Sequence, residues 1–341
     1  MAGTGTAHLH ADGTALLRAD DLVVEFPASG GRVVSAVAGI SLDVIEGETL
    51  GLVGESGCGK STTGRALIQL PPPTSGKVQF DNVELTSLKG NDLREMRPRM
   101  QMIFQDPISS LNPRRRVGDI VAEGLEIWKI GDAAARAAKV DEVLSAVGLD
   151  PAITKRRRPH EFSGGQCQRI SIARAVVTEP KLIICDEPVS ALDVSVQAQI
   201  LNLLEEMKQR YQLTLVFIAH DLAVVKNVSD RVAVMYLGKL CEVAAPDLLY
   251  AQPAHPYSAA LLAAIPVPDP GSLPDSSTVL GGEIPSPTNP PSGCRFRTRC
   301  PKAQARCVEE EPLLRAAAPG QFVACHFPLQ PGEQLEFTRP E

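Results

Sequence analysis

The sequence is short of aromatic residues, of long apolar runs and of net positive charge, and each shortage excludes a class of protein. Aromatic residues make up only 4% of the chain, too few for the stacking platforms that bind single-stranded nucleic acid. No apolar run approaches the roughly 20 residues needed to span a bilayer, and no secretory signal is recognisable at the start. The net charge of −6 gives no general attraction to nucleic acid. We therefore expect a soluble, cytoplasmic chain.

The apolar residues that are present are enough for a large core. They make up 44% of the 341 residues, which excludes a disordered chain and suits about two compact units. Short strands separated by turns are expected between Asp21 and Val53, and strands alternate with helices after Ser163. This alternation predicts an α/β fold with a mostly parallel sheet.

The amino-acid composition and pattern change along the chain, and these changes predict the domain boundaries. Residues 1–20 resemble a flexible leader, and 21–245 form the main domain, with a helical insertion at about 106–175. Within it, Val140, Val143, Leu144 and Val147 follow the spacing of one helix face. Residues 246–341 form a C-terminal extension, whose first part, 246–293, is rich in proline and is expected to be irregular.

A glycine-rich loop between an expected strand and helix has the spacing of a phosphate-binding loop, G-x-x-x-x-G-K-[ST]. Glycines let successive main-chain N–H groups face an anion, and the helix that follows adds its positive end. Lys60 is expected to reach the β- and γ-phosphates, and the Ser61 hydroxyl to bind Mg²⁺. The predicted nucleotide-binding residues here are Gly54, Glu55, Ser56, Gly57, Cys58, Gly59, Lys60, Ser61 and Thr62.

A pair of acidic residues follows the apolar run 182–185, which suits a buried parallel strand. Ligands bind at the carboxyl ends of such strands in α/β folds. Asp186 is expected to hold Mg²⁺ and Glu187 to act as the general base that polarises the attacking water.

The motif Ser163-Gly164-Gly165-Gln166, placed between the loop and the acidic strand, decides the family. With it, the sequence resembles the ATP-binding cassette (ABC) ATPases, in which two cassettes pair head to tail. The resemblance implies a P-loop NTPase (RecA-like) core of ABC type with an antiparallel β subdomain. It also implies that these four residues contact the nucleotide held by the opposite cassette.

The same resemblance assigns roles to further residues. Gln105, in Ile103-Phe104-Gln105-Asp106, would sense the γ-phosphate and contribute to the Mg²⁺ site. His220 would contact the γ-phosphate and hold the attacking water, and Asp193 would help to link the two cassettes. Phe26 is a candidate for stacking on adenine, although a plain core phenylalanine is an equal alternative.

Two further stretches narrow the resemblance to the oligopeptide/dipeptide import family, closest to its F-type ATPase subunit. They are His255-Pro256-Tyr257 and the run from Asn289 to Pro301. The resemblance implies pairing with a homologous D-type ATPase subunit and two integral-membrane permease subunits, fed by an extracytoplasmic peptide-binding protein. The chain would lie peripherally on the cytoplasmic face of the membrane and would bind no nucleic acid.

Four of the eight cysteines crowd into the last fifth of the chain: Cys294, Cys300, Cys307 and Cys325. Four cysteines are a ligand set for zinc or a [4Fe–4S] cluster, and charge alone does not decide between them. The family resemblance implies the iron–sulfur cluster, with zinc or no metal as alternatives. Nearby cations are expected to help hold an anionic cluster: Arg295, Arg297, Arg299, Lys302 and Arg306.

Two other functions compete with a transport ATPase. One is a soluble ABC ATPase that acts on ribosomes or DNA, but such proteins carry two cassettes or a long coiled coil, and this sequence has one phosphate loop. The other is a nucleotide-binding regulator, which intact Glu187 and His220 disfavour. The basic runs 114–116 and 155–158 are either solvated or a docking surface for membrane partners.

Overall fold

The structure is a computed structural model that describes residues 5–11, 13–265, 283–333 and 335. The residues fall into two compact units. The first consists of Met1–Ile45, Leu50–Ser87 and Ala219–Glu341, and the second of Glu46–Thr49 and Leu88–Ile218. These units interleave along the chain, unlike the expected division at residue 245. The phosphate loop and the C-terminal extension therefore belong to one unit.

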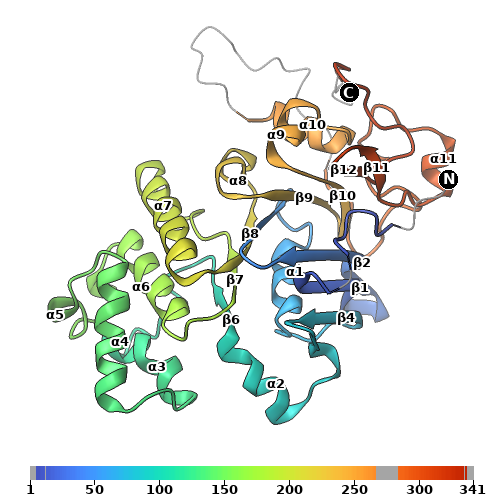
Figure 1. Ribbon diagram of the computed structural model, residues 1–341. Coiled ribbons are helices and arrows are strands. Elements are labelled where there is room, and N and C mark those ends of the chain that lie inside the picture. Colours follow the sequence, from blue (N-terminus) through green and yellow to red (C-terminus); the bar gives the residue numbers. More distant parts are fainter. Residues whose placement is uncertain (1–4, 12, 266–282, 334, 336–341) are drawn as a thin grey trace, which may run out of the picture. The chain divides into compact units, whose positions relative to one another are not determined.

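The first unit contains an antiparallel sheet of order β2-β1-β4-β5 (Figure 1). Its strands are β1 (Ala15–Pro27), β2 (Val33–Ile45), β4 (Ser75–Phe80) and β5 (Val83–Glu84). Leu17, Leu22 and Val24 of β1 are almost fully buried because they lie on the core face of this sheet. Helix α1 (Lys60–Leu67) packs against β1 and β2.

The second group of strands in this unit has the order β11-β12-β10-β9-β3. The strands are β3 (Thr49–Val53), β9 (Arg231–Tyr236), β10 (Lys239–Ala244), β11 (Arg315–Ala318) and β12 (Gln321–Val323). β3 and β9 are parallel, whereas β12 pairs antiparallel with β10. The extension thus continues the sheet that carries the phosphate loop. The helices of this region are α8 (Leu222–Val228), α9 (Pro246–Ala251), α10 (Pro256–Ala263) and α11 (Ala305–Glu309).

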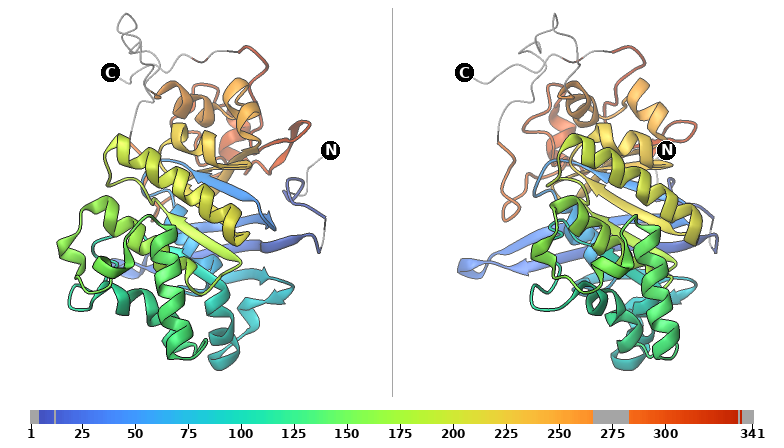
Figure 2. Two further views of the ribbon diagram at one scale, coloured as in Figure 1. Left: turned by 60° about the vertical axis from the view of Figure 1, so that its left-hand side comes forward. Right: turned by 90° about the vertical axis from the view of Figure 1, so that its left-hand side faces the viewer.

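The second unit is built on parallel strands flanked by helices (Figure 2). The strands β6 (Met100–Ile103), β7 (Leu182–Asp186) and β8 (Thr214–Ala219) are nearly all buried, as apolar parallel strands usually are. The helices are α2 (Gly90–Met96), α3 (Val117–Ile127), α4 (Ala133–Ala146), α5 (Pro151–Thr154), α6 (Gly164–Val176) and α7 (Val194–Tyr211). The predicted face of α4 is buried, and the predicted α/β fold with parallel strands is confirmed.

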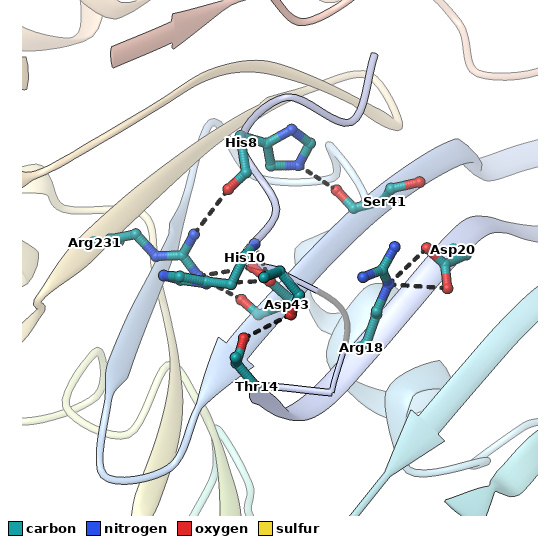
Figure 3. Close-up of polar contacts among 9 residues, drawn as sticks. His8, His10, Thr14, Arg18, Asp20, Ser41, Asp43 and Arg231 are labelled. Atoms are coloured by element: carbon teal, nitrogen blue, oxygen red, sulfur yellow. Dashed lines mark hydrogen bonds and ion pairs between the residues drawn. The ribbon is translucent and has the colours of Figure 1, made fainter. Parts of the chain in front are cut away.

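The segment before β1 differs from the expected leader (Figure 3). Residues from Ala15 onward form β1, because Leu16, Leu17 and Ala19 are buried in the sheet. Upstream, the buried carboxylate of Asp43 accepts a hydrogen bond from the His10 main-chain N–H at 2.6 Å and pairs with Arg231 at 3.0 Å. This ion pair holds the segment against β2 and β9. Residues 1–4 and 12 of the expected leader lie outside the described residues.

The proline-rich stretch is partly regular. Pro246 and Pro256 lie in the first turns of α9 and α10. The main-chain N–H that proline lacks would have no hydrogen-bond partner within the helix at these positions. The middle of that stretch, 266–282, lies outside the described residues. Among the described residues, no helix has the length and apolar character of a membrane span.

Candidate functional site

The phosphate loop lies in the first unit, between β3 and α1, as predicted. Two of its glycines are required by close contacts. A Cβ at Gly54 would lie 2.1 Å from the main-chain oxygen of Met235, and one at Gly59 would lie 2.1 Å from that of Ala36. Gly54, Gly57 and Gly59 also have positive φ angles, which larger residues rarely adopt. The loop can therefore take this curved path only with glycine at these positions.

Lys60 opens α1 and reaches back over the loop. Its ammonium donates hydrogen bonds to the main-chain oxygens of Gly54 at 2.7 Å and Glu55 at 3.0 Å. Ser61 and Thr62 follow in the first turn of the helix, both partly exposed, and Ser56 and Gly57 are exposed. Cys58 is buried, and burial raises the pKa of its thiol, so it is a packing residue rather than a reactive one.

The acidic pair lies in the second unit at the end of β7, as predicted. The Asp186 carboxylate is fully buried, and Glu187 follows with a positive φ of 46°. The Gln105 side-chain amide donates a hydrogen bond to the Glu187 carboxylate at 3.1 Å. These two predicted site residues, 82 positions apart in the chain, are thus brought together.

The glycine pair of the family motif opens α6, also in the second unit. The Ser163 hydroxyl accepts a hydrogen bond from the Gln166 main-chain N–H, and the Gln166 side chain accepts one from the Ser163 N–H at 3.0 Å. This reciprocal capping box fixes the start of the helix and leaves Ser163 and Gln166 exposed. A Cβ at Gly165 would lie 2.6 Å from Val196, while Gly164 has more room. The helix end has the form of an anion site.

The remaining predicted residues lie at element boundaries. His220 follows β8 directly and is exposed, and Asp193 is the exposed residue before α7. Phe26 lies near the end of β1, is 38% exposed and pairs with Val34 of β2. Its exposure is compatible with stacking on a base, and its role stays a prediction.

Two residues of the extension contact the phosphate loop, and the sequence did not point to either contact. Arg299 donates hydrogen bonds to both carboxylate oxygens of Glu55, at 2.7 and 3.1 Å. The Tyr257 hydroxyl accepts a hydrogen bond from the Glu55 main-chain N–H at 2.8 Å. Glu55 lies in the phosphate loop but is thus held by the extension. Arg299 stood out in the sequence only as a cation beside cysteine.

The four cysteines of the extension line one small cavity, together with His255, Phe296 and His326 among others. Burial raises the pKa of Cys300 to about 11 and that of Cys325 to about 12. Over the described part of the chain, no group of three or more His, Cys, Asp or Glu residues is arranged to hold a metal ion. The fold therefore gathers the predicted ligand set, in a thiol-rich, shielded place, without forming a metal site by itself.

The cations around these cysteines have further partners in the fold, and their expected role beside a cluster stays a prediction. Arg299 pairs with Glu55, Lys302 with Glu333 at 2.5 Å and Arg306 with Glu310 at 2.8 Å. Arg295 donates to the main-chain oxygen of Leu237. Arg297 and Lys302 line the cavity. Two of these cations thus pair with carboxylates within the extension, and Arg299 and Arg295 join the extension to the rest of the unit.

Three cations of the basic runs in the helical insertion have partners within the second unit. Arg115 forms an ion pair with Glu123, Lys155 with Asp141 at 2.5 Å, and Arg157 lies over the ring of Phe162 at 4.6 Å. These contacts favour the interpretation as a solvated, self-paired surface for those three cations.

Comparisons with known proteins agree with the motifs. A family model described as ABC transporter matches residues 37–190, and one described as oligopeptide/dipeptide transporter, C-terminal region, matches residues 241–307. The putative oligopeptide transport ATP-binding protein YkfD of Bacillus subtilis is 52% identical over 91% of this chain and 95% of its own. The oligopeptide transport ATP-binding protein OppF of Salmonella typhimurium is 51% identical over 89% of this chain and 93% of its own.

Solved structures share the fold. The ATP-binding cassette MJ0796, in a dimeric post-hydrolysis state bound to ADP and Pi, matches with a TM-score of 0.62 and 27% identity. It covers 67% of this chain and 98% of its own. The cbiO1 protein of Clostridium perfringens, part of the ABC transporter complex cbiONQ, matches with a TM-score of 0.62 and 28% identity, covering 70% and 91%.

Proposed function

The chain belongs to the ATP-binding subunits of ABC transporters of the oligopeptide/dipeptide import family, and from this premise we propose how it works. It hydrolyses ATP, and hydrolysis drives peptide import through membrane permease subunits. The observation that carries this function is the phosphate loop, curved by glycines that close contacts require and followed by Lys60 at the start of α1. ATPases that act on ribosomes or DNA are not favoured by these relatives.

We propose the following roles within one cassette. The phosphate loop binds the triphosphate, Glu187 takes a proton from the attacking water, and His220 holds that water. The hydrogen bond from Gln105 to Glu187 supports this, because it fixes the orientation of the carboxylate. Phe26 stacks on adenine.

The residues proposed for the magnesium site are Ser61, Gln105 and Asp186. They fit a hard cation, since each offers an oxygen ligand and Asp186 is a fully buried carboxylate at a strand end. When bound, Mg²⁺ neutralises charge on the phosphates.

We further propose that two cassettes pair head to tail, the second being a homologous D-type subunit, with this chain as the F-type one. The Ser163–Gln166 helix start then closes on the partner's nucleotide, and Asp193 lies at the joint. The capped, exposed N-terminus of α6 supports this, as does the dimeric form of MJ0796. The pair would act at the cytoplasmic face of the membrane, receiving peptides delivered by an extracytoplasmic binding protein.

We also propose that Cys294, Cys300, Cys307 and Cys325 hold a [4Fe–4S] cluster, with zinc as the alternative. The support is their common, shielded cavity. Such a cluster would cross-link a segment with little core of its own. Iron and sulfide analysis of anaerobically purified protein tests this proposal. A result of about one zinc ion per chain and no sulfide would identify zinc as the bound metal instead.

The experiment for the main function is purification of the chain with the membrane proteins that accompany it. ATPase activity should rise when the permease complex is present with a peptide-loaded binding protein. Stimulation by ribosomes or DNA instead, with no response to the permeases, would contradict peptide import. The wild type should bind ATP, whereas Lys60→Ala should not. This difference would locate the nucleotide at the phosphate loop.

A further inference from the structure

The phosphate loop is held from outside by the C-terminal extension, at Glu55. The Arg299 guanidinium donates hydrogen bonds to both carboxylate oxygens of Glu55, and the Arg299 side chain is only 5% exposed. The Tyr257 hydroxyl accepts the Glu55 main-chain N–H at 2.8 Å. Both the side chain and the main-chain amide of Glu55 are thus hydrogen-bonded to residues of the extension.

The position of Arg299 is itself rigid. Its main-chain N–H donates to Phe296 at 3.0 Å, and its guanidinium lies 5.9 Å from the ring centre of Tyr236. The Phe296 ring packs against Tyr236 at 5.2 Å and Tyr257 at 5.3 Å between centroids. These aromatic side chains are buried, so the guanidinium is presented to the loop by a packed support. The next residue, Cys300, lines the four-cysteine cavity.

Electrostatics explain why this contact matters for nucleotide binding. A carboxylate inside a loop that binds a triphosphate repels the ligand, and the repulsion is strong where water is partly excluded. The bidentate ion pair with Arg299 offsets the charge of Glu55 and holds its carboxylate on the guanidinium. The Tyr257 hydroxyl in turn fixes the orientation of the first amide after Gly54.

We propose that Arg299 and Tyr257 are positioning residues of the ATP site. They hold the phosphate loop in its binding shape and cancel the charge of Glu55, so that the folded state of the cysteine-bearing extension sets the affinity for ATP. This inference rests on the proposed function of the loop as the ATP site. It makes the extension a regulatory element of this subunit.

The test compares ATP binding by full-length variants, measured by isothermal titration in the presence of Mg²⁺. Arg299→Gln leaves Glu55 charged and unpaired, and should raise the Kd for ATP by about tenfold or more. Adding Glu55→Gln to Arg299→Gln removes that charge and should restore most of the affinity. In ATPase assays the single variant should raise KM while kcat stays within about twofold.

The matched control is Lys77→Ala, which breaks the exposed Lys77–Glu84 ion pair in the antiparallel sheet of the same unit. It should bind ATP like the wild type. Tyr257→Phe removes only the hydroxyl, and should speed hydrogen exchange of the loop amides in the nucleotide-free protein. If Arg299→Gln does not fold, Arg299→Lys keeps the charge but loses the bidentate grip, and should weaken ATP binding to a smaller degree.

Three results would overturn the proposal. They are wild-type affinity in the folded Arg299 variant, no recovery in the double variant, and loop exchange in Tyr257→Phe equal to the wild type. A merely structural role for Arg299 predicts that the double variant is no better than the single one. Failure of the proposed function is distinct, because the wild-type protein itself would then not bind ATP.

Discussion

At the scale of single residues, the hydrogen bond from Gln105 to Glu187 allows a sharp test of the general base. Glu187→Gln keeps the size of the side chain and an oxygen that accepts from the Gln105 amide. We expect it to bind ATP, to lose at least about 100-fold in turnover, and to accumulate as a closed cassette dimer with ATP. ATPase assays and light scattering measure these outcomes.

The control for this prediction is Glu206→Gln, an exposed carboxylate on α7 in the same unit. It should hydrolyse ATP like the wild type. Turnover near the wild-type rate in Glu187→Gln would show that another group accepts the proton.

Another residue-scale prediction concerns His255, which caps α10 and is fully buried. Its ring nitrogen accepts the Tyr257 main-chain N–H at 3.0 Å, and burial lowers its pKa to about 3, below the ordinary 6.5. Between these two pKa values, His255 binds a proton in the unfolded chain but not in the folded one. Stability is thus full above pH 6.5 and falls as the pH drops from there toward 3, by about 1.4 kcal/mol per pH unit.

The measurement is thermal unfolding of the wild type and His255→Asn between pH 7.5 and 5. Asparagine is also a good capping residue, so the variant keeps the helix start but not the titration. Burial raises the pKa of the neighbouring Glu242, an effect of opposite sign that both proteins share. Equal pH slopes in the two proteins would refute the role of His255.

The residues that sequence reasoning identified were those with a local signature. Gly54, Lys60 and Asp186 follow from spacing and from the neighbouring strand, and the structure places each at the expected strand or helix end. The contact of Arg299 with Glu55 has no such signature. Those residues are 244 positions apart, and only the fold of the extension brings them together.

At the scale of elements, the start of α6 allows capping to be separated from nucleotide contact. Ser163→Ala removes the hydroxyl that caps the helix, and should lower the free energy of unfolding by about 1 kcal/mol. Ser163→Asp restores a good cap but places a negative charge where we propose the partner's γ-phosphate binds. It should therefore regain stability and still prevent ATP-dependent pairing of the cassettes.

Urea unfolding measures the first effect, and light scattering in the Glu187→Gln background, with the partner cassette, measures the second. If Ser163→Asp still pairs normally with the partner cassette, the start of α6 does not contact the partner's nucleotide. The comparison with alanine excludes loss of stability as the cause.

Elements with strong periodicity were predictable, whereas boundaries that depend on pairing were not. The buried strands β7 and β9 and the apolar face of α4 agree with the sequence pattern. The start of β1 was missed because Ala15 to Asp20 show no clean alternation, and their pairing with β2 and β4 decides their conformation. The short β12 likewise depends on pairing, with β10 on one side and β11 on the other.

At the scale of the whole molecule, the extension and the phosphate loop form parts of one unit, and this links the proposed cluster to ATP binding. Cys300 lines the four-cysteine cavity, and its neighbour Arg299 holds Glu55. Cys300→Ser should therefore lower the iron and sulfide content of anaerobically purified protein and also weaken ATP binding several-fold. Elemental analysis and titration with ATP on the same sample measure both.

The matched control is Cys167→Ala, which removes a buried thiol from α6 in the other unit. It should change neither the metal content nor the affinity for ATP. Unchanged iron and sulfide in Cys300→Ser would argue against the cluster, whereas a lower metal content with unchanged ATP affinity would separate the cluster from the loop. Because Cys300 is expected to act on the loop through its neighbour Arg299, Cys300→Ser combined with Arg299→Gln should weaken ATP binding no further than Arg299→Gln alone.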